Sequence, residues 1–230
     1  FKKMNTIYVN IERNQKKTEN FVLEIQKSLN EIGKVDSIIG DLSSLKDIRQ
    51  VAEKFLSKYD RLDVLVNNAG GFFSRRLESV DGYEMTLALN HLNYYYLTDL
   101  LLNVLKSSLP ARIVNVSSSA HYGSKIKFND LQRENFYNGW RAYSESKLMN
   151  INFTRVLAQR LEGTGVTANA LHPGFVATNF GHGKGFFDWA IKFSQSLLAI
   201  SPQEGARTSI FLASSDEVEG ISGKYFTNCR

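Results

Sequence analysis

The sequence predicts an α/β protein with a doubly wound parallel sheet in a three-layer αβα arrangement. Short β-branched runs alternate with amphipathic helical segments along the whole chain, and strands that alternate with helices of this length form βαβ units. Polar clusters follow the ends of the strand-like runs, which is where ligands bind in open α/β sheets. The 230 residues contain no linker and no internal repeat, so residues 1–230 are expected to form one domain.

The first half of the chain contains three predicted strands and the helices between them. Strand 6–11 is a β-branched run, strand 35–39 ends at a Gly-Asp pair, and strand 62–66 ends in Asn-Asn-Ala-Gly. Helix 17–29 repeats apolar residues every three or four positions,. Ser44 is expected to cap the next helix, because a serine before an apolar periodic run is a typical helix start,.

The second half continues the alternation. Two of its strands end in polar runs, one in Ser-Ser-Ser and the other in His-Pro-Gly. In order, the predicted elements are helix 85–107, strand 112–116, helix 141–161, strand 166–171, helix 202–213 and strand 223–226.

Composition and charge narrow the classes of function. The chain has a net charge of +5, but its lysines and arginines are interleaved with acidic residues, so we expect no nucleic-acid partner. No apolar run is long enough to cross a membrane,. The single cysteine, Cys229, excludes a disulfide framework, and the histidines lack metal-ligand spacing,. We therefore expect a cytoplasmic protein without a metal site.

Tyr143 and Lys147 form the most informative pair. Their i, i+4 spacing in a predicted helix puts both side chains on one face,. A lysine ammonium near a phenol favours the phenolate and lowers the pKa of the tyrosine, and a tyrosine tuned in this way exchanges protons near neutral pH. The alternative is an accidental pair on an exposed helix, because this spacing is common.

Several motifs fall in a fixed order around this pair. Asn-Asn-Ala-Gly at 67–70 and Asn90 come first, three serines occupy 117–119, and His-Pro-Gly at 172–174 follows the pair. In this order and at these strand ends, the motifs resemble those of the short-chain dehydrogenase/reductase family over essentially the whole chain. The resemblance implies a Rossmann-like fold and an oxidoreductase that transfers a hydride between a nicotinamide cofactor and an alcohol or carbonyl.

A closer resemblance is to the retinol-dehydrogenase-like branch of that family. Ala-His at 120–121 follows the serines, and Gly-Thr-Gly-Val-Thr occupies 163–167. The gap between Ser118 and Tyr143 is longer than in most of the superfamily, and this branch carries an insertion there, around 126–140.

The resemblance implies a role for each of four residues. Tyr143 donates a proton to the substrate carbonyl or removes one from the alcohol. Lys147 lowers the pKa of Tyr143 and hydrogen-bonds the nicotinamide ribose. Ser118, rather than either neighbouring serine, polarises the carbonyl oxygen, and Asn90 positions a water in the proton relay.

The resemblance also implies a cofactor site along the strand ends. Asp41 and Leu42 would border the adenine. The backbone that approaches the cofactor closely would be that of Asn68, Ala69 and Gly70. The residues that hold the carboxamide end would be Pro173, Gly174, Val176 and Thr178.

The choice between NAD and NADP depends on Glu12 and Arg13, at the end of the first strand. An acidic residue there hydrogen-bonds the ribose 2′-OH and repels a 2′-phosphate, whereas an arginine accommodates the phosphate. Glu12 occupies the position that usually decides, so the sequence favours NAD. The alternative is that Glu12 turns away and Arg13 makes an NADP enzyme.

One family feature is missing from the sequence. The family begins with a strand and a glycine-rich turn that holds the pyrophosphate at a helix N-terminus, and neither precedes strand 6–11. The missing strand would lie in the middle of the sheet, and its loss would leave two edges with unpaired backbone groups. We therefore expect a natural polypeptide that is longer at its N-terminus, where a membrane anchor could also lie. A true truncation would favour a catalytically silent scaffold or interaction protein.

Residues 175–200 are expected to form a substrate lid within the domain, in which Phe186, Phe187 and Trp189 face an apolar substrate,. The sequence leaves the substrate and the number of subunits open. A homodimer through the helix that carries Tyr143 and Lys147, or through the helix that contains Tyr94, fits the family resemblance.

Overall fold

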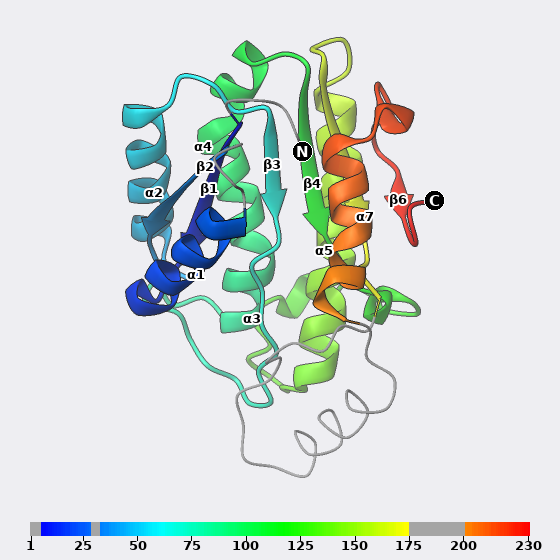
Figure 1. Ribbon diagram of the computed structural model, residues 1–230. Coiled ribbons are helices and arrows are strands. Elements are labelled where there is room, and N and C mark those ends of the chain that lie inside the picture. Colours follow the sequence, from blue (N-terminus) through cyan, green and yellow to red (C-terminus); the bar gives the residue numbers. More distant parts are fainter. Residues whose placement is uncertain (1–5, 29–32, 175–200) are drawn as a thin grey trace.

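The fold consists of parallel strands and the helices that connect them (Figure 1). The computed structural model describes residues 6–28, 33–174 and 201–230. Within them, the strands are β1 (Thr6–Glu12), β2 (Gly33–Ile39), β3 (Val64–Asn67), β4 (Ala111–Val116), β5 (Val166–Leu171) and β6 (Tyr225–Phe226). The α-helices are α1 (Gln15–Ser28), α2 (Leu45–Lys58), α3 (Met85–Leu87), α4 (Asn93–Ser107), α5 (Gly139–Arg160) and α7 (Pro202–Ser214).

The strands form two parallel sheets. β1 pairs with β2, and the second sheet has the order β3-β4-β5-β6. Every pair is parallel, as the alternation of strands and helices predicted. Within the described residues, however, no strand joins β1 to β3, so the predicted sheet is not continuous. The break lies between β1 and β3, where a missing middle strand was expected to leave two open edges.

Helices cover both faces of the second sheet. α4 and α5 pack on one face, and α7 crosses in front of β4 on the other (Figure 1). α1 packs on the β1–β2 sheet, and α2 contacts both β2 and α4. This is the three-layer arrangement that the sequence predicted. Among the described helices, none combines the length and the apolar character needed to cross a bilayer.

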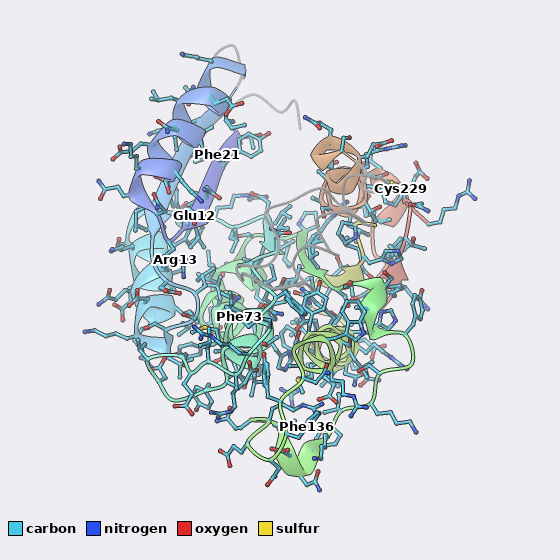
Figure 2. All side chains as sticks on the ribbon, turned by 90° about the horizontal axis from the view of Figure 1, so that it is seen from below. Glu12, Arg13, Phe21, Phe73, Phe136 and Cys229 are labelled. Carbon is cyan, nitrogen blue, oxygen red and sulfur yellow. The ribbon has the colours of Figure 1, made fainter. Side chains whose placement is uncertain are left out.

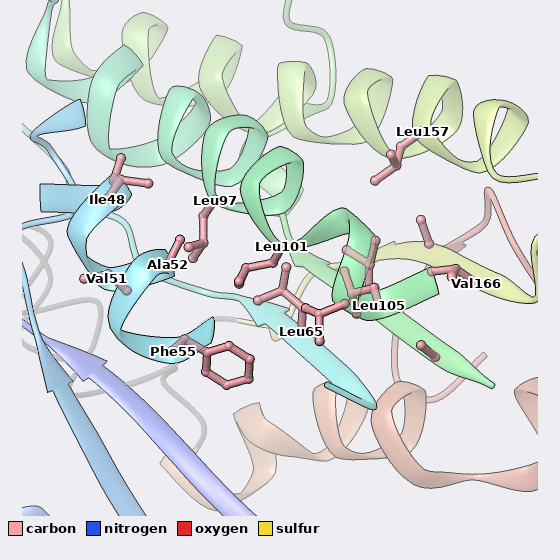
Figure 3. Close-up of a cluster of buried hydrophobic side chains, with 14 of the residues drawn as sticks. Ile48, Val51, Ala52, Phe55, Leu65, Leu97, Leu101, Leu105, Leu157 and Val166 are labelled. Atoms are coloured by element: carbon pink, nitrogen blue, oxygen red, sulfur yellow. The ribbon is translucent and has the colours of Figure 1, made fainter. Parts of the chain in front are cut away.

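One apolar cluster connects the two sheets (Figure 3). Ser44 caps α2 as predicted, and the helix buries a face that includes Ile48 and Phe55. This face meets α4 at Leu97 and Leu101. Val9 of β1 packs against the same cluster. The two sheets therefore share a core, although no described backbone hydrogen bond joins β1 to β3.

A chain of buried polar side chains crosses this core. Asn67 Nδ2 donates to Asn115 Oδ1 at 2.8 Å and to Thr98 Oγ1 at 3.0 Å. Asn115 Nδ2 in turn donates to Thr154 Oγ1 at 2.9 Å. Asn67 and Asn115 lie opposite each other in β3 and β4, so the chain links both strands to α4 and α5. Buried amides require such partners, and the register of the two strands supplies them.

The predicted helix 85–107 is interrupted. α3 is followed by a π-helical turn, Ala88–Leu92, before α4 begins. Glu84 caps α3, because its two carboxylate oxygens accept hydrogen bonds from Thr86 N and Leu87 N, each at 2.8 Å. Apolar periodicity does not reveal one π-helical turn within a long helix, and such turns are frequent at functional sites. This one contains Asn90.

Candidate active site

The polar runs after β3, β4 and β5 meet at one edge of the second sheet. These strands are parallel, so their carboxyl ends share that edge,. The backbone N–H of Ser117 donates to Leu171 O at 2.7 Å, which joins the turn after β4 to the end of β5. The structure therefore brings together the runs at 67–70, 117–119 and 172–174. No three described histidine, cysteine or acidic side chains lie close enough to hold a metal ion.

α5 carries Tyr143 and Lys147 into this edge. Asn138 caps the helix, because its side chain accepts a hydrogen bond from Arg141 N at 3.0 Å,. Ser117 Oγ donates to Lys147 O at 2.7 Å and so anchors the helix to the end of β4. Both Tyr143 and Lys147 are buried. Their helical spacing places them on the side of α5 that faces the strand ends, which is not an exposed surface.

The side chain of Ser118 is hydrogen-bonded to the Tyr143 phenol. Ser118 Oγ also accepts a hydrogen bond from Ala120 N at 3.2 Å, at the start of a short 3-10 turn, Ser119–His121. Burial raises the pKa of Tyr143 to about 12, and the bond to Ser118 acts in the opposite direction,. Of the three serines, Ser118 is thus the one next to the phenol.

The ammonium group of Lys147 lies over the ring of the same tyrosine. Its Nζ is 5.7 Å from the ring centroids of both Tyr143 and Tyr94 and donates to Val116 O at 3.1 Å. Burial lowers the pKa of Lys147 to about 8,. The family resemblance implied that Lys147 lowers the pKa of Tyr143. In this structure the burial of the phenol outweighs any such effect, and the pKa of Tyr143 is raised.

Asn90 connects the turn after β3 to α5. Its Oδ1 accepts from Gly71 N at 2.8 Å, and its Nδ2 donates to Gly71 O at 3.0 Å. The same Nδ2 donates to Ser146 Oγ at 3.1 Å, and Asn150 Nδ2 donates to Asn90 O at 2.8 Å. The sequence analysis did not single out Ser146 and Asn150, because isolated polar residues inside a helix carry no signal of their partners.

The residues expected around the adenosine lie at the end of β1 and after β2. Figure 2 shows Glu12 and Arg13 next to each other on the side of α1. Glu12 Oε1 accepts from Arg13 N at 2.9 Å, and Arg13 Nη1 lies 3.8 Å from Asp41 Oδ2. Asp41 Oδ1 accepts from Ser43 N at 2.9 Å. The structure therefore brings Glu12, Arg13 and Asp41 together, whereas the half-buried Leu42 packs against the apolar core.

The segment after β3 passes the buried side chains of Asn90 and Lys147. It consists of Asn68, Ala69 and Gly70. A Cβ on Gly70 would lie 3.1 Å from Asn90 Oδ1 and 3.5 Å from Lys147 Nζ. This close approach explains the preference for a residue without a side chain at that position.

The carboxamide end is only partly described. Pro173 and Gly174 directly follow β5, and Gly174 has a φ of +84°, which a glycine adopts without strain,. Val176, Thr178 and the predicted lid at 175–200 lie outside the described residues.

Aromatic rings flank the phenol of Tyr143. The ring of Phe72 lies edge-on with its centroid 6.2 Å away, and that of Trp140 is tilted at 6.3 Å. Trp140 is 51% exposed. The ring of Tyr143 is therefore in contact with one buried aromatic ring and one exposed aromatic ring. The sequence analysis did not single out Phe72, because its contact with Tyr143 spans distant parts of the chain.

The chain is similar in sequence to known proteins. The model of the family described as "short chain dehydrogenase" matches residues 1–185. The chain is 50% identical over 200 residues to Retinol dehydrogenase 14 of Homo sapiens, covering 83% of this chain and 57% of that relative. It is 45% identical over 189 residues to Retinol dehydrogenase 11 of Homo sapiens, covering 82% of this chain and 59% of that relative. The chain therefore spans less than two thirds of the length of these relatives.

The fold is also similar to that of solved structures. The Pseudomonas aeruginosa RhlG/NADP active-site complex aligns with a TM-score of 0.71 and 25% sequence identity. The alignment covers 95% of this chain and 83% of that chain.

Proposed function

Because this chain belongs to the short-chain dehydrogenase family, we propose that it transfers a hydride between a nicotinamide cofactor and the alcohol or carbonyl of an apolar substrate. The observation that carries the proposal is the meeting of Ser118, Tyr143 and Lys147 at the carboxyl ends of the strands. An apolar substrate is supported by Phe72 and Trp140 beside the phenol, and by relatives that are named retinol dehydrogenases.

The residues present fit a nicotinamide cofactor. The Lys147 ammonium has three N–H groups, and its one hydrogen bond within the described residues is to Val116 O. It therefore has donors left for the hydroxyls of a ribose. Gly70 leaves the space beside this ammonium and Asn90 free of a side chain. When bound, the cofactor would supply or accept the hydride.

Tyr143 is the proton donor in this proposal. A phenol with a pKa of about 12 is protonated near neutral pH, so it can donate to the oxygen of a carbonyl as that carbonyl is reduced. The hydroxyl of Ser118 polarises the same oxygen, and the charge of Lys147 stabilises the phenolate left behind. Asn90 orders the turn at Gly71 beside these groups.

We further propose that the cofactor is NADP(H), held through Arg13. The sequence favoured NAD through Glu12, but the Glu12 carboxylate already accepts the N–H of Arg13. The side chain of Arg13 is 70% exposed, and its guanidinium lies near Asp41, which is expected to border the adenine. An exposed guanidinium can bind a 2′-phosphate through two hydrogen bonds. The similar RhlG structure is a complex with NADP.

Replacement of Arg13 tests this cofactor preference. Arg13→Gln should lower kcat/KM for NADPH about tenfold or more, because a charge-assisted contact with the 2′-phosphate is lost. The value for NADH should change little. Glu12→Gln serves as the matched control and should not weaken the use of NADPH. A preference of the unchanged protein for NADH that Glu12→Gln abolishes would instead establish NAD as the cofactor.

Tyr143→Phe tests the reaction itself. The variant should lose at least about 100-fold in turnover of an apolar aldehyde such as retinal, because the proton donor is removed. Cofactor binding, measured by titration calorimetry, should remain close to that of the unchanged protein. Tyr95→Phe, which removes an exposed hydroxyl on α4, should leave turnover unchanged. Undiminished turnover in Tyr143→Phe would refute the mechanism. An unchanged protein that neither binds cofactor nor turns over would favour the catalytically silent scaffold.

A further inference from the structure

A cluster of histidine and tyrosine rings lies beside Ser118, where β4, β5 and β6 end. The ring centroids of His121 and His172 lie 5.0 and 5.6 Å from that of Tyr225. The ring of Tyr122 is tilted against that of His121, with a centroid distance of 4.2 Å. We refer to His121, Tyr122, His172 and Tyr225 as the His–Tyr cluster. The proposed hydride transfer does not use any of these side chains.

The hydrogen bonds of the cluster assign different tautomers to its two histidines. His121 Nδ1 lies 2.6 Å from Ser118 O, and a carbonyl oxygen only accepts, so His121 carries its proton on Nδ1. His172 Nδ1 lies 2.6 Å from Tyr225 Oη, and its Nε2 lies 3.3 Å from Thr227 Oγ1. A neutral His172 satisfies both contacts if Nδ1 accepts the Tyr225 proton and Nε2–H donates to Thr227.

The His–Tyr cluster contacts Ser118 at the backbone carbonyl of that serine. Ser118 O accepts hydrogen bonds from His121 N at 3.1 Å and from His121 Nδ1 at 2.6 Å. Ser118 Oγ is bonded to Tyr143. A movement of the His121 ring would turn the Ser118 carbonyl and the hydroxyl with it. The ring is prevented from moving by Tyr122 on one side and Tyr225 on another.

We propose that His121, Tyr225 and His172 are positioning residues that keep the Ser118 hydroxyl in its hydrogen bond with the Tyr143 phenol. They do so only while His172 is neutral. The kinetic consequence rests on the proposed function, whereas the assignment of tautomers rests on the geometry alone.

Protonation of His172 would reverse its bond to Tyr225. With protons on both nitrogens, the ring can only donate, so the Tyr225 proton must turn away, toward Tyr122, with which Tyr225 also shares a hydrogen bond. His172 is faced by His121 from the turn after β4 and by Tyr225 from β6. Neither provides a negative charge at neutral pH. Burial and the neighbouring His121 lower the pKa of His172, so the neutral arrangement holds near pH 7.

Nitrogen-15 NMR of the imidazole rings tests the geometry without turnover. At pH 7.5 we expect the Nδ1–H tautomer for His121 and the Nε2–H tautomer for His172. Tyr225→Phe should shift the nitrogen resonances of His172 and leave those of His91 unchanged, because His91 contacts Asn150 instead. The same tautomer on both cluster histidines, or an unmoved His172 in Tyr225→Phe, would overturn the proposal.

The pH dependence of turnover tests the positioning role. In the unchanged enzyme kcat should fall as the pH drops below the pKa of His172. His172→Asn keeps an acceptor near the position of Nδ1 but does not ionise, so it should retain kcat within about threefold at pH 7.5 and lose the acid decline. Tyr225→Phe should lower kcat about tenfold with little change in KM for the cofactor.

Two controls separate this inference from others. Tyr95→Phe should keep the pH profile of the unchanged enzyme. A His172→Asn variant with the original acid decline would disprove the positioning role, because the decline would then belong to another group. If the unchanged protein shows no turnover, the proposed function fails, and the tautomers alone then decide whether the His–Tyr cluster has the arrangement inferred here.

Discussion

Lys147 carries an ammonium group in a buried position beneath Tyr143. Burial lowers its pKa from 10.5 to about 8. Below pH 8 the lysine is protonated in both the folded and the unfolded chain, and the folded state bears the cost of burying a charge. Between pH 8 and 10.5 the folded protein releases the proton while the unfolded chain still binds it. The free energy of unfolding therefore gains a positive contribution as the pH rises through this window.

Lys147→Met should stabilise the protein at pH 7, because methionine fills a similar space without a charge. Val116 O, which loses its bond to Nζ, still accepts the Tyr94 hydroxyl at 3.3 Å. The gain over the unchanged protein should shrink by pH 10, where the folded lysine is neutral. Urea unfolding at both pH values measures this difference, with the exposed Lys46→Met as the control. A gain that is equal or larger at pH 10 would contradict the assigned burial.

Some site residues could be predicted from neighbouring residues in the sequence, whereas others depend on contacts between distant parts of the chain. Tyr143 and Lys147 were predictable, because the helical spacing that brings them together is written in consecutive residues. The contact between His121 and Tyr225 was not predictable, since 104 residues separate them and no local pattern links the two. Family resemblance identified Ser118, but the hydrogen bonds of its carbonyl with His121 became visible only in the folded chain.

At the scale of single elements, the seating of α5 determines where Tyr143 lies. The helix begins at Gly139, and a Cβ there would lie 2.3 Å from Phe73 O. Tyr137, just before the helix, donates from its hydroxyl to the same Phe73 O at 2.9 Å. The first turn of α5 thus rests directly on the backbone that follows Gly70 and Gly71. A methyl group on residue 139 would therefore not fit beside Phe73 O.

Gly139→Ala should therefore destabilise the fold, although alanine is the better helix former. Forcing a methyl group against a backbone carbonyl costs roughly 1–3 kcal/mol, which exceeds a propensity gain of about 1 kcal/mol. Urea unfolding measures the change. Arg141→Ala in the same turn is exposed and should change stability by no more than about 0.5 kcal/mol. A Gly139→Ala variant as stable as the unchanged protein would show that α5 can shift at its start.

The helices also show where prediction from periodicity ends. The apolar pattern located α2 and its cap at Ser44, because both features are local. It joined α3 and α4 into one helix, because a single π-helical turn does not break the run of apolar residues in the sequence. The turn is stabilised by tertiary contacts of Asn90 with Gly71 and Ser146, and no local pattern encodes those contacts.

At the scale of the whole molecule, the two sheets are held with different strength. No side chain of β1 is buried, and β2 buries Val35 and Ile38. In β4 and β5, five of six positions are buried in each strand. Val66 of β3, which lies on the sheet edge toward β1, is 43% exposed. The alternation of elements predicted that the strands run parallel, but the sequence could not show how the two sheets share one core.

Hydrogen exchange should reflect this difference. Amides of β1 and β2 should exchange through openings that cost less free energy than those of β4 and β5, because fewer buried contacts oppose them. Exchange followed by mass spectrometry over peptides 6–12, 33–39, 111–116 and 166–171 measures both groups in one sample. Protection of β1 as strong as that of β4 would mean that a further chain segment or partner pairs with its open edge.

The polar chain from Asn67 through Asn115 to Thr154 has a consequence for recombination between related proteins. Each of its amides finds a partner only if the neighbouring element supplies the matching group at the same depth. A crossover point within this set would give a hybrid in which one parent's amide meets the other parent's side chain. β3, α4, β4 and α5 should therefore be inherited together, and viable chimaeras should have their junctions before Val64 or after Arg160.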